Sequence, residues 1–519
     1  MAFLLNLFKS TPTAPERVPT DTVIPLHALD DTQVNRSMAI DFSMRFDDAL
    51  DVDKLVGALE KLLDRPGWKK LGARVRLNSE GKLEYHIPAQ FTKDRPAVNV
   101  THVKHDMPIS QHPLASQIPR PTGTIQTLLD VRKFRPLFVS EHSPTELKHW
   151  IYTEHAQLHL HIVSFADATL VTLTWLHTLL DGMGRNMLLR CWTAMLEGRE
   201  QDIPEFYGYD FDPLARLGAL TDSKLKEDAD VEEEEYILKE KTVSGWKMFR
   251  FVLGYMWELL VYRKEQIGVV VLPSSMFKRI RAEALYDLSS MHPATIVMDT
   301  SDPSNPKPFL SDGDILCAWW TRLIISSQPW LASAKPTKTI QIMNVFGMRN
   351  LLTDTQPQLL PKGVAYISNC VTAICSFFSL SEFLSLPLGR VAARIRADLV
   401  QQSTRPQVEA NMRLTKAGYA KSGHAPLYGD ADMVFSAFSN WTKGKMFETD
   451  FRAAVIKEAD VEHSVGRPSY IQADGTAKGF SVRNSGPCIG KDWKGDWWVG
   501  ASLRPEAWRN LARAVEGMK

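Results

Sequence analysis

The segment that most constrains the fold is residues 158–197, in which two apolar runs precede a helical pattern. The runs lie on either side of Asp167 and Ala168, and such a pair with a short polar break is typical of two strands and a turn. After residue 184, apolar side chains recur at helical spacing. The residues that form this face are Met187, Leu188, Cys191, Trp192 and Met195. Because strands alternate with helices, the sequence predicts a mixed α/β fold.

Three further segments have clear local patterns. Residues 53–64 place leucines on one helical face. Residues 73–87 contain two alternating runs around a Ser-Glu-Gly turn, which predicts a β-hairpin. Residues 251–262 are strongly apolar, but Glu258 interrupts them and a helix that spans a bilayer needs about 20 residues. We expect a core or interdomain helix there.

A change of composition divides the chain. The 519 residues are enough for two large domains. A strongly charged run at 221–241 differs from both sides, and acidic runs of this kind are usually solvated. We therefore expect a loose lead-in over 1–20, an N-terminal domain over 21–205, a charged crossover linker over 206–265 and a C-terminal domain over 266–519.

The charge balance argues against a nucleic-acid-binding protein. Lys plus Arg total 61 and Asp plus Glu total 60, a net charge of +1, and no basic stripe is visible, whereas proteins that bind nucleic acid mainly through its phosphates usually carry one. The five cysteines form no CxxC pair, which is typical of a reducing compartment. The first ten residues lack the features of a signal peptide. We expect a cytoplasmic monomer with a small-molecule partner, no nucleic acid and no membrane insertion.

The sharpest chemical signal is the sequence WLHTLLDGMG at 175–184. A strand-like run ends at His177, and Asp181 and Gly182 follow before the helix. A histidine with a pKa of about 6.5 can take a proton from an alcohol at neutral pH if its position is fixed. A carboxylate can hold the following turn, and a glycine lets the backbone fold tightly there. Since a His and an Asp four residues apart also occur by chance, this prediction of a general base needs support from the rest of the chain.

Other catalytic and metal-binding patterns are not found in the sequence. There is no GxSxG elbow and no HExxH motif, and the glycines at 486–492 are too close together for a phosphate-binding loop. His155, His159 and His161 lie close together, but alternation along a half-exposed strand explains them at least as well as a metal site. We expect no metal.

Five further blocks follow the HTLLDG sequence. They are SDGDILCAWWTR at 311–322, MNVFGMRN at 343–350, GVAYISNCV at 363–371, FSAFSNW at 435–441 with MFETDF at 446–451, and GDWWVGASLRPEAW at 495–508. Together with His177, Asp181 and Gly182, they resemble in order and spacing the motifs of the BAHD-type acyl-CoA-dependent acyltransferases, in particular divergent fungal members such as the trichothecene acetyltransferases. The resemblance covers most of residues 20–519.

This resemblance implies two chloramphenicol-acetyltransferase-like domains of similar fold that meet at a central solvent channel. It implies acyl-CoA as co-substrate, no bound cofactor, and a small-molecule alcohol, in the default case a secondary metabolite, that receives an acetyl group. His177 is then the general base in the channel, and Ser439 and Trp441 are candidate donors to the oxyanion. Asp181 is expected to point away from the channel and to pair with Arg349.

The remaining site residues also follow from the resemblance. Tyr366 and Asn369 are expected to line the channel, although they could equally be packing residues. Asp450 is assigned a structural role near the CoA entrance. Lys443 and Lys445 are the nearest basic candidates for the CoA phosphates, although either could lie on a solvated loop instead.

The sequence departs from the family at two places. Ser368 stands where the family usually has Gly, and Arg452 follows the Asp-Phe pair where the family has Gly, so the CoA pocket is expected to differ in detail.

Three hypotheses besides acyl transfer from CoA to a hydroxyl stay open. One is a condensation-like enzyme, which takes thioesters from carrier proteins; such domains have a second His before the motif, whereas Leu176 precedes His177 here. Another is acyl transfer to an amine. The third is a non-catalytic binding protein of the same fold, although His177, Asp181 and Gly182 together argue against it.

Overall fold

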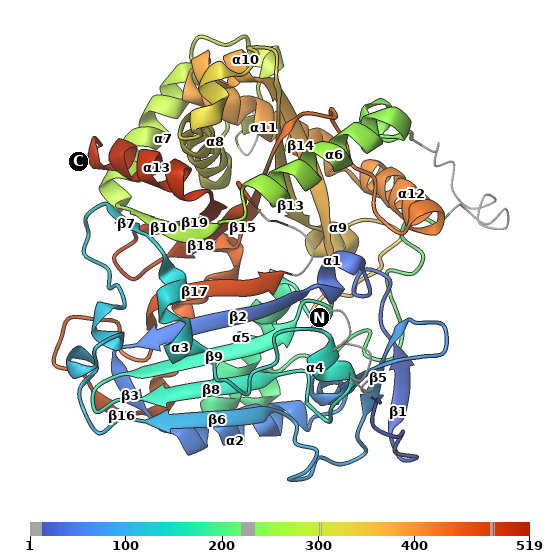
Figure 1. Cartoon of the computed structure of the whole chain (residues 1–519), viewed down its shortest axis with the longest axis vertical. Coiled ribbons are helices and arrows are strands. Elements are labelled where there is room, and N and C mark those ends of the chain that lie inside the picture. The colour runs from blue at the N-terminus through green and yellow to red at the C-terminus, as the bar shows by residue number, and fades with distance from the viewer. Residues whose placement is uncertain are drawn as a thin grey trace, which may run out of the picture.

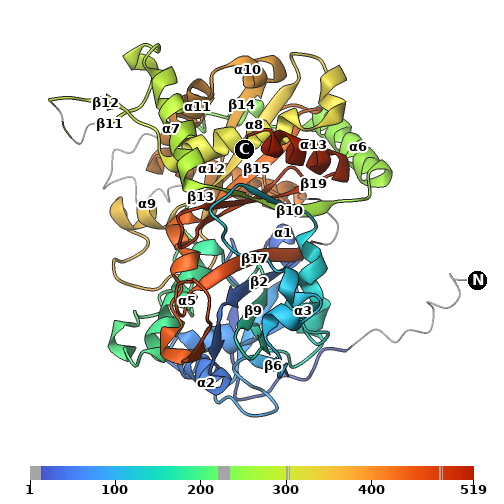
Figure 2. The ribbon, with the colours of Figure 1, turned by 90° about the vertical axis from the view of Figure 1, so that its left-hand side faces the viewer.

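Two bodies, each built on a β-sheet, lie one above the other (Figures 1 and 2). The computed structural model describes residues 13–219, 234–299, 302, 304–477, 481 and 483–518. The first twelve residues of the expected lead-in and most of the charged run at 221–241 lie outside the described residues. Both bodies combine helices with strands, which confirms the mixed α/β fold.

The lower body in Figure 1 contains a five-stranded sheet in the order β17-β2-β9-β8-β6. The strand bounds, in that order, are Pro468–Ala477, Met38–Phe46, Thr169–Leu176, His159–Ser164 and Asn99–Lys104. Helices α2 (Val52–Leu63) and α5 (Gly182–Leu196) pack on each other and share one apolar core with the sheet. The strand pair and both helices expected in this region are therefore confirmed.

Local sequence explains why α2 forms and which face it buries. Asp51 precedes the helix, and its carboxylate accepts from the backbone N–H of Lys54 at 3.0 Å, which satisfies one of the free N–H groups at the helix start. The leucines at helical spacing form the buried face. The cap and the buried leucines therefore fix the position of α2 against α5, the helix that follows His177.

The upper body contains a seven-stranded sheet in the order β14-β13-β15-β18-β19-β10-β7. The strand bounds, in that order, are Val371–Ser379, Thr339–Gly347, Val434–Asn440, Gly486–Lys491, Trp497–Leu503, Gln266–Leu272 and Gln126–Leu128. Four helices of 12 or more residues share a second core with this sheet. They are α7 (Ser274–Leu288), α8 (Asp312–Ser326), α11 (Leu388–Gln402) and α13 (Pro505–Glu516).

Each of the two main sheets includes one edge strand that comes from the half of the chain forming most of the other sheet. Strand β7 pairs with β10 at the edge of the upper sheet, and β17 pairs with β2 at the edge of the lower sheet. The bodies are thus interleaved in sequence, which local patterns do not show. The domain limits expected at 205 and 266 stay a prediction.

The remaining elements are short or peripheral. Strands β1 (Thr22–Pro25), β5 (Leu83–Ile87) and β4 (Arg74–Leu77) form one small sheet, and its β4–β5 pair confirms the expected hairpin. Two more pairs are β16 (Val455–Glu458) with β3 (Asp48–Leu50) and β11 (Met298–Asp299) with β12 (Lys307–Pro308). The remaining α-helices inside the bodies are α1 (Gln33–Arg36), α3 (Arg135–Phe138), α4 (Lys148–Ile151), α9 (Arg349–Asp354), α10 (Leu380–Ser385) and α12 (Arg405–Ser422).

The expectation of a core or interdomain helix at 251–262 is wrong. The helix there is α6 (Gly245–Val261), and none of its residues is buried. It lies on the outside of the upper body (Figure 2). Its apolar composition indicated burial, but only one side of the helix contacts the protein. Within the part of the chain that the structure describes, no helix is both long and apolar enough to cross a membrane.

Candidate active site

His177 lies directly after β9, where the chain turns toward α5. Its backbone N–H donates to the carbonyl of Met38 at 2.8 Å, and its own carbonyl accepts from the side-chain amide of Asn369 at 2.9 Å. Both bonds use backbone atoms of His177, so they fix the residue without occupying the imidazole. The side chain is half-buried. Its Nδ1 is enclosed without a hydrogen-bond partner among the described residues, whereas Nε2 is not enclosed.

The surroundings of His177 favour a neutral imidazole. Burial lowers the pKa of His177 below its ordinary value of 6.5, because a charged imidazole loses hydration there. The positive charge of Arg185 acts in the same direction, while Asp181 and the Asn369 amide oppose it. The net change in pKa is downward, so His177 is neutral at about pH 7 and can accept a proton.

Asp181 caps helix α5 and is fully engaged in hydrogen bonds. Its Oδ1 accepts from the backbone N–H groups of Met183 and Gly184 at 3.0 and 2.9 Å. Arg349 donates to both carboxylate oxygens at 2.9 Å, and the N–H of Cys370 donates to Oδ2 at 2.9 Å. The expected ion pair between Asp181 and Arg349 is present. Because every lone-pair direction is used within the protein, Asp181 holds the turn rather than facing a substrate.

The Asp181–Arg349 pair connects the two bodies. Burial alone would raise the pKa of Asp181, but the charge and hydrogen bonds of Arg349 hold that pKa below its ordinary value, so the carboxylate stays ionised. Arg349 begins α9 and also donates to the carbonyls of the segment before β14. These are the carbonyls of Tyr366, Ile367 and Ser368, at 2.9, 3.3 and 2.7 Å. One guanidinium thus joins the turn after His177 to the C-terminal half of the chain.

The backbone role expected of Gly182 belongs to Gly184. A Cβ atom on Gly184 would lie 2.0 Å from the carbonyl oxygen of Ile367, so the close approach of these segments needs a glycine. A Cβ atom on Gly182 would meet the ring of Trp441 at 3.5 Å, an ordinary contact. Gly182 is the first residue of α5, and its φ is not positive. The cap provided by Asp181 makes the turn.

Tyr366 and Asn369 are buried, with exposed fractions of 5% and 2%, so they pack behind the site rather than line a channel. The side-chain amide of Asn369 donates to Asp30 at 2.8 Å and to the His177 carbonyl at 2.9 Å. The hydroxyl of Tyr366 shares a hydrogen bond of 3.2 Å with His27. Asn369 therefore holds the backbone of His177 directly, and Tyr366 packs in the same buried region through its bond to His27.

The hydrogen bonds of Asn369 and Tyr366 lead to a buried cluster of three titratable residues, which are Asp30, His27 and Lys70. Asp30 lies 3.7 Å from one ring nitrogen of His27, and the ammonium of Lys70 lies 3.3 Å from the other. Burial raises the pKa of Asp30 to about 7, lowers that of His27 to about 3 and lowers that of Lys70 to about 8. Sequence reasoning missed this cluster, because its members come from separate segments with no shared local pattern.

Strand β15 brings Ser439 and Trp441 to the start of α5. The Trp441 ring lies beside Gly182, 3.5 Å from the place that a Cβ atom on that residue would take, and its Nε1–H donates to Ser439 Oγ at 2.8 Å. Both side chains are half-buried. Because the indole N–H is already occupied, the hydroxyl proton of Ser439 is the donor that remains for a reacting atom.

Arg185, one turn into α5, is a site residue that sequence reasoning missed. Its guanidinium is stacked between the rings of Phe42 and Trp441, at 4.0 and 4.3 Å from the ring centroids. It is 2% exposed, and its Nε and Nη2 have no hydrogen-bond partner among the described residues. Burial lowers its pKa to about 9. A single arginine within a helical pattern normally indicates an exposed position, so no signal marked it.

The basic candidates lie on the turn after β15. Lys443 is exposed on the short helix η9 (Thr442–Gly444), which contacts α5. The ammonium of Lys445 pairs with Glu448 at 3.1 Å and is also exposed. Asp450 is partly buried and lies 3.4 Å from Arg467. This geometry leaves Lys443 as the more available cation.

Two of the three clustered histidines, His155 and His159, hydrogen-bond with each other, and Thr101 bonds His159 and His161. The rings of His155 and His159 are stacked with centroids 5.3 Å apart, and their nitrogens approach to 3.2 Å. Thr101 bonds His159 at 3.0 Å and His161 at 2.8 Å. Among the described residues, no group of three or more potential ligands is arranged to hold a metal ion.

We expect this stack to make the protein acid-sensitive. Burial lowers the pKa of His155 to about 4 and that of His159 to about 3. The unfolded chain binds these protons at about 6.5, so the stability that the neutral pair contributes is full above that pH and is lost as pH falls toward 4. At about pH 5 the loss is roughly 2 kcal/mol for each histidine.

Urea unfolding at about pH 7 and pH 5 measures this loss. The double variant His155→Gln with His159→Gln should lose roughly 4 kcal/mol less over this range than the wild type. The matched control is His142→Gln, since the His142 side chain is 73% exposed. Equal losses in the wild type and the double variant would show that the stack does not carry the acid sensitivity.

Solved structures share this fold. The chain superposes on TRI101 of F. sporotrichioides, crystallised with coenzyme A and T-2, with a TM-score of 0.63 at 14% identity, covering 96% of this chain and 98% of TRI101. It superposes on vinorine synthase with a TM-score of 0.55 at 14% identity, covering 98% and 95%. At this identity the similarity establishes the fold. No family model matches the sequence.

Sequence relatives are similar over nearly the full length. The chain is 36% identical to acetyltransferase sphE of Aspergillus fumigatus, covering 100% of this chain and 99% of sphE. It is 38% identical to the transcriptional regulator calD of Penicillium decumbens, covering 99% of each. It is 35% identical to acetyltransferase adrJ of Penicillium rubens, covering 98% and 99%. The chain belongs to the BAHD-type acyltransferase superfamily, in its divergent fungal branch. It is accordingly an acyltransferase.

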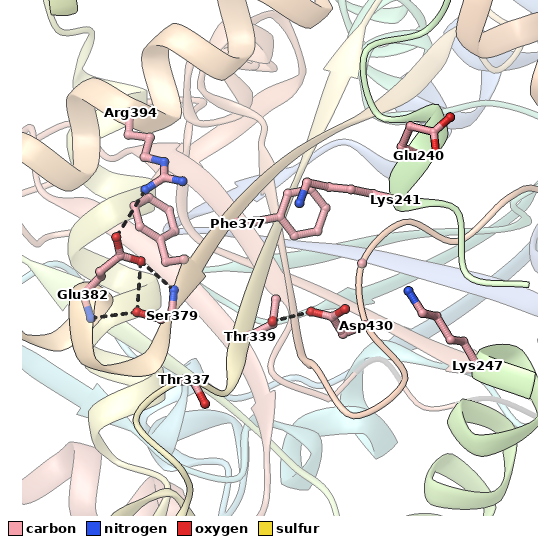
Figure 3. A pocket seen from close by; sticks show the side chains of 12 residues that line it. Glu240, Lys241, Lys247, Thr337, Thr339, Phe377, Ser379, Glu382, Arg394 and Asp430 are labelled. Carbon is pink, nitrogen blue, oxygen red and sulfur yellow. Dashed lines mark hydrogen bonds and ion pairs between the residues drawn. The ribbon is translucent and has the colours of Figure 1, made fainter.

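A surface hollow lies in another part of the upper body (Figure 3). It has a volume of about 350 Å³ and is lined by charged side chains of the upper body. Several of these are already paired: Glu382 caps α10, and Asp430 accepts from Thr339. Lys247 extends toward the hollow from the first turn of α6 (Figure 3). None of the site residues expected from the sequence lines it.

Proposed function

We propose that this protein transfers an acyl group, acetyl in the default case, from acyl-CoA to a hydroxyl of a small-molecule acceptor. The observation that carries the proposal is the state of His177: a neutral imidazole, with Nε2 open, on a turn that Asp181 and Arg349 hold rigid. Such a group is suited to take a proton from an alcohol. The full-length similarity to proteins named acetyltransferases supports the same reaction.

The proposed reaction has two steps. In the first, Nε2 of His177 takes the proton of the acceptor hydroxyl while the oxygen attacks the thioester carbonyl carbon, which gives a tetrahedral oxyanion. In the second, the carbon–sulfur bond breaks, and His177 returns the proton to the sulfur. The products are the ester and free CoA, so atoms and protons balance.

The oxyanion needs positive charge or donors nearby. We propose Ser439 as the hydrogen-bond donor, positioned by the bond that it accepts from Trp441. Arg185 places a buried positive charge beside the same residues. That charge favours a neutral His177 before reaction and an anionic intermediate during it, because opposite charges attract strongly where water is excluded.

Thiol release from acetyl-CoA tests the proposed reaction directly. The purified protein is incubated with acetyl-CoA and a panel of metabolite alcohols and amines, while free thiol and product mass are followed. Acceptor-dependent thiol release with an acetylated alcohol supports the proposal. Products acetylated only on nitrogen would replace the hydroxyl acceptor with an amine. Transfer only from an acyl-carrier protein would establish a condensation-like reaction, and no turnover with any donor would favour a binding protein.

Lys443 and Lys445 are expected to assist acyl-CoA binding through its phosphates. Replacing both with Ala should raise KM for acyl-CoA by about 2- to 10-fold, because exposed ion pairs contribute little each, and should leave KM for the acceptor unchanged. Added salt should raise the wild-type KM for acyl-CoA as well. The matched control replaces Lys278 and Lys335, two exposed lysines outside the candidate site. Equal effects of both double variants would remove these lysines from the CoA site.

A further inference from the structure

Helix α6 presents an apolar face that no described residue covers. Trp246 is 70% exposed and Trp257 is 67% exposed. Four more large apolar residues with high exposure follow the same side of the helix at spacings of three and four residues. They are Phe249, Leu253, Met256 and Leu260. A water-facing helix surface is normally polar, and a continuous apolar face of this size marks a surface that binds something.

The opposite face of α6 contacts the upper body and fixes the orientation of the helix. Glu258 bonds Arg483 and Arg504 at 2.7 and 3.0 Å. The hydroxyl of Tyr255 accepts from the backbone N–H of Ser481. Met248, Phe251, Tyr255 and Leu259 are half-buried toward the protein. Since polar bonds and apolar contacts anchor this inner face, the outer face is held outward at the rim of the upper body (Figure 2).

The charged residues on α6 and just after it are positive with one exception. Lys247, Arg250, Arg263 and Lys264 are exposed, and none of them has a carboxylate partner in the part of the chain that the structure describes. The only acidic residue between 245 and 264 is Glu258, which points inward to its arginines. The exposed side of α6 and the residues just after it therefore combine large apolar side chains, two of them tryptophans, with the cations Arg250, Arg263 and Lys264, whereas Lys247 extends toward the hollow.

We propose that α6 docks the protein on a membrane that contains anionic lipid, lying flat in the interface. A helix with exposed Trp, Phe and Leu flanked by Lys and Arg binds such surfaces, because the apolar side chains enter the acyl boundary and the cations approach the headgroups. Tryptophan prefers this depth. The geometry fits surface binding, since α6 is anchored along its inner face and is too short to span.

The charge pattern favours a lipid surface over a second copy of this chain. In a symmetric dimer the same patch meets itself, so Arg250, Arg263 and Lys264 would face the same cations of the other copy, and the one acidic residue within 245–264, Glu258, points inward. Such a contact is repulsive, whereas an anionic membrane supplies the opposite charge. This inference does not depend on the acyl-transfer reaction, because none of these residues belongs to the candidate site.

Vesicle flotation with the full-length protein tests the proposal. The vesicles are phosphatidylcholine alone and phosphatidylcholine with phosphatidylserine. The wild type should float with the anionic vesicles, less with the neutral ones, and less as salt rises. The double variant Trp246→Ser with Trp257→Ser should lose at least about tenfold in vesicle partitioning, and Arg250→Gln with Lys264→Gln should lose the preference for anionic vesicles. Matched controls are Tyr286→Ser and Ile456→Ser, which replace apolar residues that are at least as exposed as Trp257 and lie elsewhere.

The possible outcomes distinguish a membrane from a second copy of the chain as the partner of the exposed face of α6. Binding of the wild type and of the controls, together with loss in the tryptophan double variant, supports the proposal. Vesicle binding that is equal in the wild type and the tryptophan double variant would overturn it, as would a wild type that stays unbound to both vesicle types. A concentration-dependent dimer in sedimentation that the tryptophan double variant abolishes, without vesicle binding, would assign the face to a second copy instead. Circular dichroism and urea unfolding that match the wild type confirm that the double variant is folded.

Discussion

Replacing His177 with Ala is expected to lower kcat for acyl transfer by about 10²–10⁴-fold and to leave the protein folded. The chemical step loses its base, because Nε2 is the open nitrogen at the proposed reaction centre. The two hydrogen bonds that fix the residue use its backbone N–H and carbonyl, and both survive in alanine. KM for acyl-CoA should change little. The measurement is steady-state thiol release, with circular dichroism and urea unfolding as checks on the fold.

Two further results would identify His177 as the base. Added imidazole should restore part of the lost rate, since the substitution leaves a space of that shape. In the wild type, kcat/KM should rise with pH through a pKa below 6.5 and then level off, because only the neutral imidazole accepts a proton and burial lowers its pKa. His142→Ala, on an exposed residue, is the matched control. A His177→Ala enzyme that keeps more than about a tenth of wild-type kcat would exclude this role.

Elements with strong local periodicity could be predicted from the sequence, whereas the surroundings of a helix could not. The helices α2 and α5, the β8–β9 pair and the β4–β5 hairpin all follow from the spacing of apolar residues within one segment. For α6, periodicity and composition identified an apolar helix, but not what covers it. Apolar side chains are buried equally well in a protein core, against a partner or in a membrane interface, and sequence composition does not distinguish these.

Contacts between distant segments account for the rest of what the sequence did not reveal. The exchange of β7 and β17 between the sheets depends on pairing across hundreds of residues. Asn369 looked like a channel residue because its motif was recognised without its partners, Asp30 and the His177 carbonyl. Arg185 is buried between Phe42 of β2 and Trp441 of the turn after β15, which are distant from it in the sequence. The motif residues could be predicted one by one, but their supporting residues could not.

Replacing Asp181 with Asn is expected to lower the free energy of unfolding by roughly 3–5 kcal/mol and to reduce activity with it. The substitution keeps the shape of the side chain but removes the charge that Arg349 neutralises. The guanidinium then stays buried without a counter-charge, and an amide cannot accept from all five donors that surround the carboxylate. Urea unfolding and thiol release on the same preparation measure both losses.

A double-mutant cycle shows whether the pair itself carries this loss. Arg349→Met alone should destabilise the protein by a similar amount, and the combined variant should be less destabilised than the sum of the two, because removing both charges leaves no unpaired buried ion. Lys82→Met serves as control: its pair with Glu80 is about two-thirds exposed on each side and should contribute no more than about 1 kcal/mol. An Asp181→Asn protein with wild-type stability and no activity would contradict the structural role and would place the carboxylate in the reaction instead.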